Sequence, residues 1–89
     1  NIAEFHLYQN QPNPFKEYTV IGFDLPEAED VTLTFYDITG KLIKVIETDA
    51  VKGYNEIQIQ KSDLEVNGLV HYKLKTSTHS SSKHMIVIE

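Results

Sequence analysis

The sequence contains no cysteine, tryptophan or arginine. Without cysteine the chain has no disulfide, no cysteine-based zinc site and no thiol chemistry. All eight basic residues are lysines, and the formal net charge is −5. Basic patches supply most of the affinity of nucleic-acid-binding proteins, so this composition argues against that class. No apolar run approaches the roughly 18 residues that a membrane-spanning helix needs.

The size and hydropathy of the chain fit one small folded domain. It has 89 residues, 40% of them hydrophobic, and a mean hydropathy of −0.31. A chain of this size buries roughly 60–65% of its unfolded surface. We therefore expect residues 1–89 to form a single domain, with residues 1–7 as a linker or an edge strand. Because the sequence starts at Asn1 and not at a methionine, we expect it to be part of a larger protein.

Apolar and polar residues alternate along several short stretches, which is typical of strands with one buried face. Val31, Leu33 and Phe35 alternate with threonines and a tyrosine. Asp37-Ile-Thr-Gly40 then has turn chemistry, because aspartate can accept hydrogen bonds from the following backbone and glycine tolerates positive φ. The other strand-like stretches are 5–8, 19–25, 42–46, 53–60, 69–75 and 83–89. About seven short antiparallel strands separated by turns predict an all-β sandwich.

Two stretches depart from the strand pattern. Residues 62–66 are expected to form at most one short helical turn, in which Ser62 is the N-cap, Glu65 completes a capping box and Leu64 plugs the sandwich. The polar stretch 76–82 is expected to be the loop of the last hairpin.

Two of the expected strands depart from regular alternation. The apolar residues of 42–46 do not alternate, so this strand is either buried on both faces or bulged near Lys44. Gly22 inside a strand indicates a bulge or a close backbone approach.

No set of side chains predicts catalysis or a cofactor site. His71 and His84 could pair across the last hairpin, with His79 in its loop, but their spacing does not bring together the ligands that zinc needs. The acidic turn 27–30 with Asp24 could hold calcium, yet it lacks the spacing of a dedicated calcium loop. The five tyrosines could line a sugar-binding face, although their scatter along the sequence favours packing. We therefore predict a non-catalytic domain without metal or cofactor.

Six segments taken in order carry the pattern of a known family. They are Tyr8-Gln-Asn-Gln-Pro-Asn-Pro-Phe15, Thr19-Val-Ile-Gly-Phe-Asp-Leu-Pro26, Val31-Thr-Leu-Thr-Phe-Tyr-Asp-Ile-Thr-Gly40, Gly53-Tyr-Asn-Glu56, Leu64 to Tyr72, and Lys83-His-Met-Ile-Val87. With these segments the chain resembles the type A C-terminal sorting domain of type IX secretion, which is found on exported proteins of the Bacteroidota. The resemblance covers most of the chain, and its strongest parts are the first segment and the end of the third.

The resemblance implies an Ig-like, Greek-key β-sandwich at the C-terminus of a cargo protein, where the outer-membrane secretion machinery recognises it. Such domains are often removed by a sortase-like peptidase that attaches the cargo to surface lipopolysaccharide, so the domain is a substrate and not an enzyme. The implied location is the cell surface or the medium, reached through the periplasm and outer membrane. The residues that carry the family pattern, and are therefore predicted to serve recognition, are Pro12, Asn13, Pro14, Phe15, Gly40, Gly53, Gly68, Lys83, Met85, Ile86, Val87 and Ile88.

The chain departs from the family pattern in two places. Val70 stands where an aromatic residue is common, and the basic C-terminal segment is reduced to Lys83 and His84 before Glu89. By the resemblance, the scissile segment would lie at or before residues 1–4.

The last strand is predicted to be the main recognition element. Lys83–Glu89 has apolar residues on both faces, and such a strand at a sheet edge can add to the sheet of a partner. Deleting it from a reporter fusion is therefore expected to stop export. Two alternatives remain, namely an accessory carbohydrate- or protein-binding module of a secreted enzyme, and a structural spacer.

Overall fold

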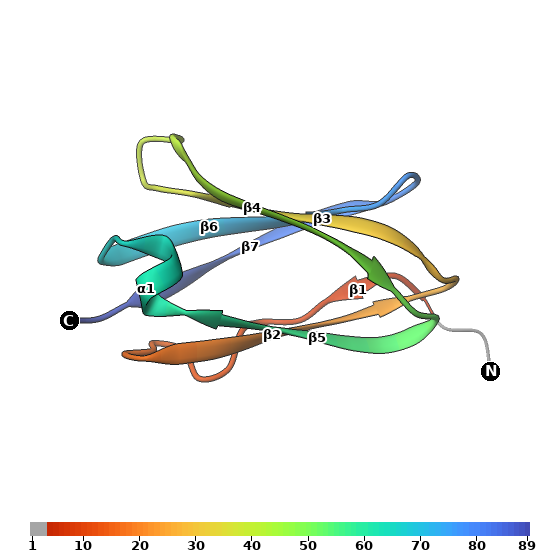
Figure 1. Cartoon of the computed structure of the whole chain (residues 1–89), viewed down its shortest axis with the longest axis horizontal. Coiled ribbons are helices and arrows are strands. Elements are labelled where there is room, and N and C mark those ends of the chain that lie inside the picture. The colour runs from red at the N-terminus through yellow and green to blue at the C-terminus, as the bar shows by residue number, and fades with distance from the viewer. Residues whose placement is uncertain (1–3) are drawn as a thin grey trace.

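The computed structural model describes residues 4–89, which form two antiparallel sheets packed face to face (Figure 1). The first sheet has the order β1-β2-β5, with β1 at His6–Leu7, β2 at Tyr18–Leu25 and β5 at Gly53–Gln60. The second has the order β4-β3-β6-β7, with β3 at Glu29–Tyr36, β4 at Leu42–Ala50, β6 at Gly68–Lys75 and β7 at Ser80–Val87. A single helical turn, α1 (Lys61–Leu64), connects β5 to β6. This arrangement confirms the predicted all-β sandwich.

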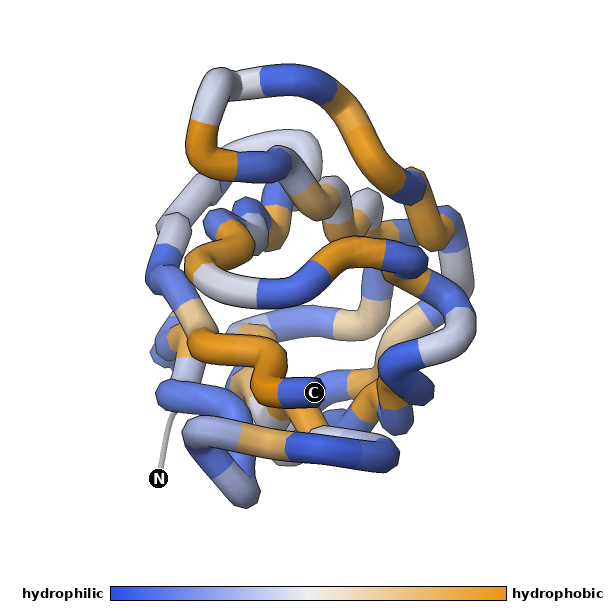
Figure 2. Tube along the Cα trace, turned by 90° about the vertical axis from the view of Figure 1, so that its left-hand side faces the viewer, coloured by the Kyte–Doolittle hydropathy of each residue, from blue (hydrophilic) through white to orange (hydrophobic). Residues whose placement is uncertain are grey.

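The core lies between the two sheets and consists of the inward-facing residues of each strand. Hydrophobic and hydrophilic segments accordingly alternate along the trace in Figure 2. Each fully buried aliphatic or aromatic side chain stabilises the fold by about 1.5–3 kcal/mol relative to an exposed one. The inward residues that are buried include Ile21, Phe23, Leu25, Val31, Leu33, Phe35, Ile59, Val70, Tyr72 and Leu74.

The helical turn is present, but its predicted cap is wrong. The turn begins at Lys61, and its N-cap is Gln60, whose backbone N–H donates to the Asp63 carboxylate at 3.1 Å. Asp63 lies three residues after Gln60 and completes a capping box with it. The N-cap therefore lies two residues before the predicted Ser62. Leu64 is buried and plugs the end of the sandwich as predicted.

The other local expectations are settled by strand register. Phe35 lies opposite Lys44 while Tyr36 lies opposite Leu42, so Ile43 is an extra residue on β4 and the predicted bulge near Lys44 is confirmed. The last hairpin loop is shorter than the predicted 76–82, because β7 already begins at Ser80.

The predicted edge strand at the N-terminus is confirmed at His6–Leu7, which pairs with β2 at one edge of the first sheet. Residues 1–3 of the predicted linker and of the predicted scissile segment lie outside the described residues. Across residues 4–89, no helix has the length and apolar character needed to cross a membrane.

Candidate recognition surface

Strand β7 lies at one edge of the second sheet, and the end of the first family segment, Tyr8–Phe15, runs beside it. The Phe15 N–H donates to the Ile86 carbonyl at 3.0 Å, and the Ile88 N–H donates to the Phe15 carbonyl at 2.9 Å. The Asn13 side-chain oxygen accepts the Ile86 N–H at 3.0 Å. The fold thus brings together two predicted recognition segments from opposite ends of the sequence.

These bonds correct the prediction of a free sheet edge along Lys83–Glu89. The outward backbone groups of Ile86 and Ile88 are already bonded to Asn13 and Phe15. The Gln9 side-chain amide also donates to the His84 carbonyl at 2.8 Å. A partner strand therefore cannot add at Ile86–Ile88 unless the Asn13–Phe15 segment leaves.

A buried polar network holds the segment that leads to Phe15. The Asn10 N–H donates to the Tyr72 hydroxyl at 2.9 Å, and that hydroxyl donates to the Tyr8 carbonyl at 3.0 Å. The Asn10 side-chain amide donates to Thr19 Oγ1 at 3.0 Å and to the Pro12 carbonyl at 3.1 Å. Burial raises the pKa of Tyr72 to about 12, so at neutral pH its hydroxyl keeps the proton that it donates.

Sequence reasoning missed Asn10, Thr19 and Tyr72 as the residues that position this segment. An asparagine two residues before a proline is a turn signal, because its side chain can bond nearby backbone groups. Nothing in the local pattern, however, indicates a bond between Asn10 and Tyr72, which are distant in the sequence.

The stretch Pro12–Phe15 of the first family segment contains both exposed and buried residues. Pro12 and Pro14 are exposed, and both follow cis peptide bonds. Phe15 is buried in the core, so its ring pins the loop to the sandwich. The motif therefore links the two sheets at the edge next to β7.

The predicted recognition residues of β7, and Ile88 directly after it, also divide between the two faces of the strand. Met85 and Val87 face the core and are buried. Ile86 and Ile88 face outward, each with 43% of its surface exposed. Lys83 is half-buried and lies opposite Tyr72 of β6. Only the outward residues can contact a partner while the sandwich remains folded.

The three predicted glycines shape turns at separate places. Gly40, Gly53 and Gly68 have φ values of 88°, 94° and 93°. Gly68 lies beside β7, opposite Val87, whereas Gly53 lies in the first sheet, opposite Leu25. The structure therefore places only Gly68 next to the β7 surface.

The turn between β3 and β4 forms as the sequence predicts. The Asp37 carboxylate accepts bonds from the Thr39 hydroxyl at 2.6 Å, the Thr39 N–H at 2.9 Å and the Lys41 N–H at 3.0 Å. These bonds, chiefly that from the Thr39 hydroxyl, lower the pKa of Asp37. Gly40 follows with the positive φ that closes the turn.

The histidines occupy the predicted places. His71 lies opposite His84 across the last hairpin, with the ring centroids 5.1 Å apart, and His79 stacks on Phe5. Over residues 4–89, no group of three or more histidine, aspartate or glutamate side chains is arranged to hold a metal ion.

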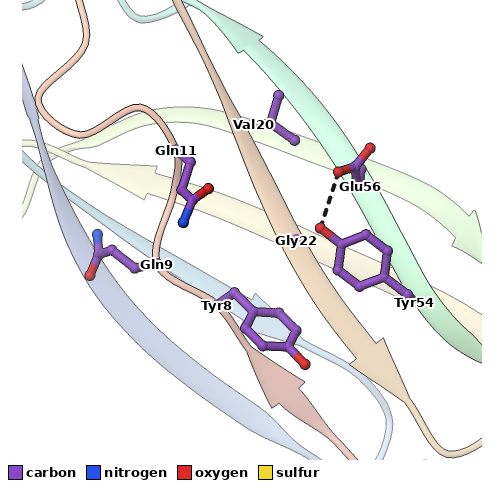
Figure 3. A pocket seen from close by; sticks show the side chains of 7 residues that line it. All are labelled: Tyr8, Gln9, Gln11, Val20, Gly22, Tyr54 and Glu56. Atoms are coloured by element: carbon purple, nitrogen blue, oxygen red, sulfur yellow. Dashed lines mark hydrogen bonds between the residues drawn. The ribbon is translucent and has the colours of Figure 1, made fainter.

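Two of the five tyrosines, Tyr8 and Tyr54, gather on the outer face of the first sheet. The rings of Tyr8 and Tyr54 lie 5.9 Å apart, with an angle of 63° between their planes. They border a hollow above Gly22, shown in Figure 3. The sequence does not show this cluster, because the pairing of β1, β2 and β5 creates it.

Comparisons with known proteins come from a family model and from solved structures. The family model described as "Secretion system C-terminal sorting domain" matches residues 10–89. The search of curated proteins gave no match. The chain is similar to part of dimeric latent PorU from Porphyromonas gingivalis, with 22% identity and a TM-score of 0.69 over 97% of this chain and 9% of that one. A β-glucosidase from Listeria innocua in complex with glucose gives 14% identity and a TM-score of 0.48 over 98% of this chain and 16% of that one. This chain thus spans a small part of both proteins, and the PorU likeness shows a shared fold.

Proposed function

The chain belongs to the family of secretion-system C-terminal sorting domains, and we propose that the outer-membrane export machinery recognises it through the outer face of β7. Domains of this family are non-catalytic C-terminal signals for type IX secretion. The observation that carries the proposal is the exposure of Ile86 and Ile88 on a strand whose edge is already bonded to Asn13 and Phe15.

The proposed contact is made by side chains and not by strand addition. Covering the exposed side chains of Ile86 and Ile88 with a partner would remove apolar surface from water. The occupied edge at Ile86 and Ile88 disfavours a partner strand there. Recognition by side chains would leave the sandwich intact.

The segment at Asn13 and Phe15 supports recognition by fixing the conformation of β7. Its three hydrogen bonds hold Ile86 and Ile88 in one geometry before a partner arrives. A surface ordered in advance loses less conformational entropy on binding. On this proposal, Pro12–Phe15 positions the recognition strand and does not itself touch the machinery.

A sortase-like peptidase is the second proposed partner, with a cargo domain on the N-terminal side. Cleavage at or before residues 1–4 would release the sandwich without cutting a strand, because β1 begins at His6. The cargo would then remain at the cell surface or in the medium after passing through the periplasm and outer membrane.

Export of a reporter fused in front of this chain tests the proposal in a host with type IX secretion. Deleting Lys83–Glu89 is a blunt test, because it also removes Met85 and Val87 from the core. The double substitution Ile86→Thr with Ile88→Thr changes only outward positions and keeps residues that suit a strand.

The matched control is Leu42→Thr with Val45→Thr on β4, at the opposite edge of the same sheet. These side chains are 52% and 44% exposed, so both pairs lose similar exposed apolar surface. We expect the β7 variant to stay inside the cell and the β4 variant to be exported, with both purified domains folded. Normal export of the β7 variant would refute the proposed surface.

A further inference from the structure

The hollow on the outer face of the first sheet has the build of a ligand site. It is an open hollow of about 410 Å³ between the segment after β1 and strand β5, with β2 as its floor (Figure 3). Small-molecule sites commonly combine apolar and aromatic walls with a few convergent polar groups. The residues that line it are Tyr8, Gln9, Gln11, Val20, Gly22, Tyr54 and Glu56.

Gly22 makes room for one aromatic wall. A Cβ atom at this position would meet ring carbons of Tyr54 at 2.9 Å, which is too close for two carbon atoms. The missing side chain therefore allows the Tyr54 ring to lie against β2. The register of β2 and β5 runs through Gly22 without a shift, so the predicted bulge is absent and the close approach comes from a side chain.

Carboxylates hold both rings in place. The Tyr54 hydroxyl donates to Glu56 Oε2 at 3.1 Å, and the Tyr8 hydroxyl donates to Asp24 Oδ2. The hydrogen bond to Asp24 raises the pKa of Tyr8, while desolvation and then the bond to Glu56 raise that of Tyr54. The rings nevertheless remain open to a ligand, because Tyr8 is 38% exposed and Tyr54 is 56% exposed.

We propose that this hollow binds a sugar unit of a neutral oligosaccharide. A pyranose has an apolar C–H face that suits an aromatic ring, and a rim of hydroxyls that suits amides and carboxylates. The Gln11 amide and the Glu56 carboxylate supply such groups beside the two rings.

The charge of the hollow selects against acidic sugars. Glu56 lines it, and Asp24 is bonded to the Tyr8 hydroxyl at its border, while the chain as a whole carries a net charge of −5. A uronic acid or a phosphorylated sugar would be repelled by these carboxylates. The two tyrosines and Gly22 lie on or beside the first sheet and Ile86 and Ile88 on the second, so substitutions at Tyr54 and Gly22 test sugar binding without changing the proposed export surface.

The test is a titration of the 89-residue chain, followed by two-dimensional amide NMR. The probes are cellohexaose, maltohexaose, laminarihexaose and mannohexaose as neutral ligands, with oligogalacturonate as the acidic comparison. We expect at least one neutral probe to shift amide resonances of Gln9, Gln11 and Gly22 with a dissociation constant below about 1 mM, and the acidic probe to shift none.

Three variants separate binding in the hollow from a general surface effect. Tyr54→Ala should weaken binding by roughly tenfold or more, which corresponds to about 1.4 kcal/mol. Gly22→Ala should weaken it similarly by displacing the Tyr54 ring. Tyr18 is exposed on β2, the strand of Gly22, but does not line the hollow. Tyr18→Ala should therefore leave the affinity for the sugar unchanged.

Two results would overturn the proposal. One is the absence of shifts with all four neutral probes. The other is binding that Tyr54→Ala and Gly22→Ala leave intact while both variants remain folded.

Discussion

Removing the Tyr72 hydroxyl tests whether the buried polar network holds the segment that covers β7. Tyr72→Phe deletes one oxygen, which donates to the Tyr8 carbonyl at 3.0 Å and accepts the Asn10 N–H at 2.9 Å. A hydrogen bond contributes about 0.5–1.5 kcal/mol net, and a buried group left without a partner costs about 1–3 kcal/mol. Because Asn10 is buried, its N–H would find no water. We therefore expect the free energy of unfolding to fall by about 2–3 kcal/mol.

Urea denaturation of wild type and variant measures this loss directly. A loss of this size corresponds to a melting temperature lower by roughly 10–20 °C in a domain of this length. Tyr18→Phe is the matched control, since Tyr18 is exposed, and we expect its unfolding free energy to stay within about 0.5 kcal/mol of wild type. A Tyr72→Phe variant as stable as this control would refute the role assigned to the hydroxyl.

Hydrogen exchange shows whether the loss reaches the recognition strand. The Ile86 and Ile88 amides donate to Asn13 and Phe15, so they should exchange faster in Tyr72→Phe by more than the global loss of stability explains. Equal acceleration at all slowly exchanging amides would show that the network stabilises the domain without controlling β7.

Three further predictions concern stability. Burial raises the pKa of Tyr72 to about 12 from its ordinary 10.0. The stability linked to its neutral form should therefore be intact below pH 10.0 and decline as the pH rises towards about 12. Urea titrations should show this decline in wild type and a weaker one in Tyr72→Phe. Phe15→Ala removes a buried ring and should cost about 3–5 kcal/mol in unfolding experiments, whereas a loss below about 1 kcal/mol would mean that the ring does not anchor the loop. Hydrogen bonds from Thr39 and Lys41 lower the pKa of Asp37. This carboxylate should therefore stabilise the fold fully above pH 3.8, its ordinary pKa, and less as the pH falls below that value. Asp37→Asn should flatten that part of the pH profile in thermal melts, and an unchanged profile would contradict this.

The sequence by itself determined the class of fold and the inward face of most strands. A period of two is a local property, since successive side chains of any strand point to opposite sides. It correctly predicted that Val31, Leu33 and Phe35 form the buried face of β3. Turn chemistry is equally local, and the Asp37–Gly40 turn forms as expected. The predicted N-cap of the helical turn was wrong by two residues, because the Asp63 carboxylate accepts the Gln60 N–H and so caps the turn at Gln60.

Only the tertiary structure decided which distant segments meet. The sequence indicated that Lys83–Glu89 is the last strand, but not that Phe15 forms hydrogen bonds along its edge. Alternation assigns a residue to a face without naming the strand that lies beside it, and the partner depends on how the whole chain closes. For the same reason, the network around Tyr72 and the hollow beside Tyr54 emerge only when residues far apart in the sequence are brought together by the packing of the two sheets.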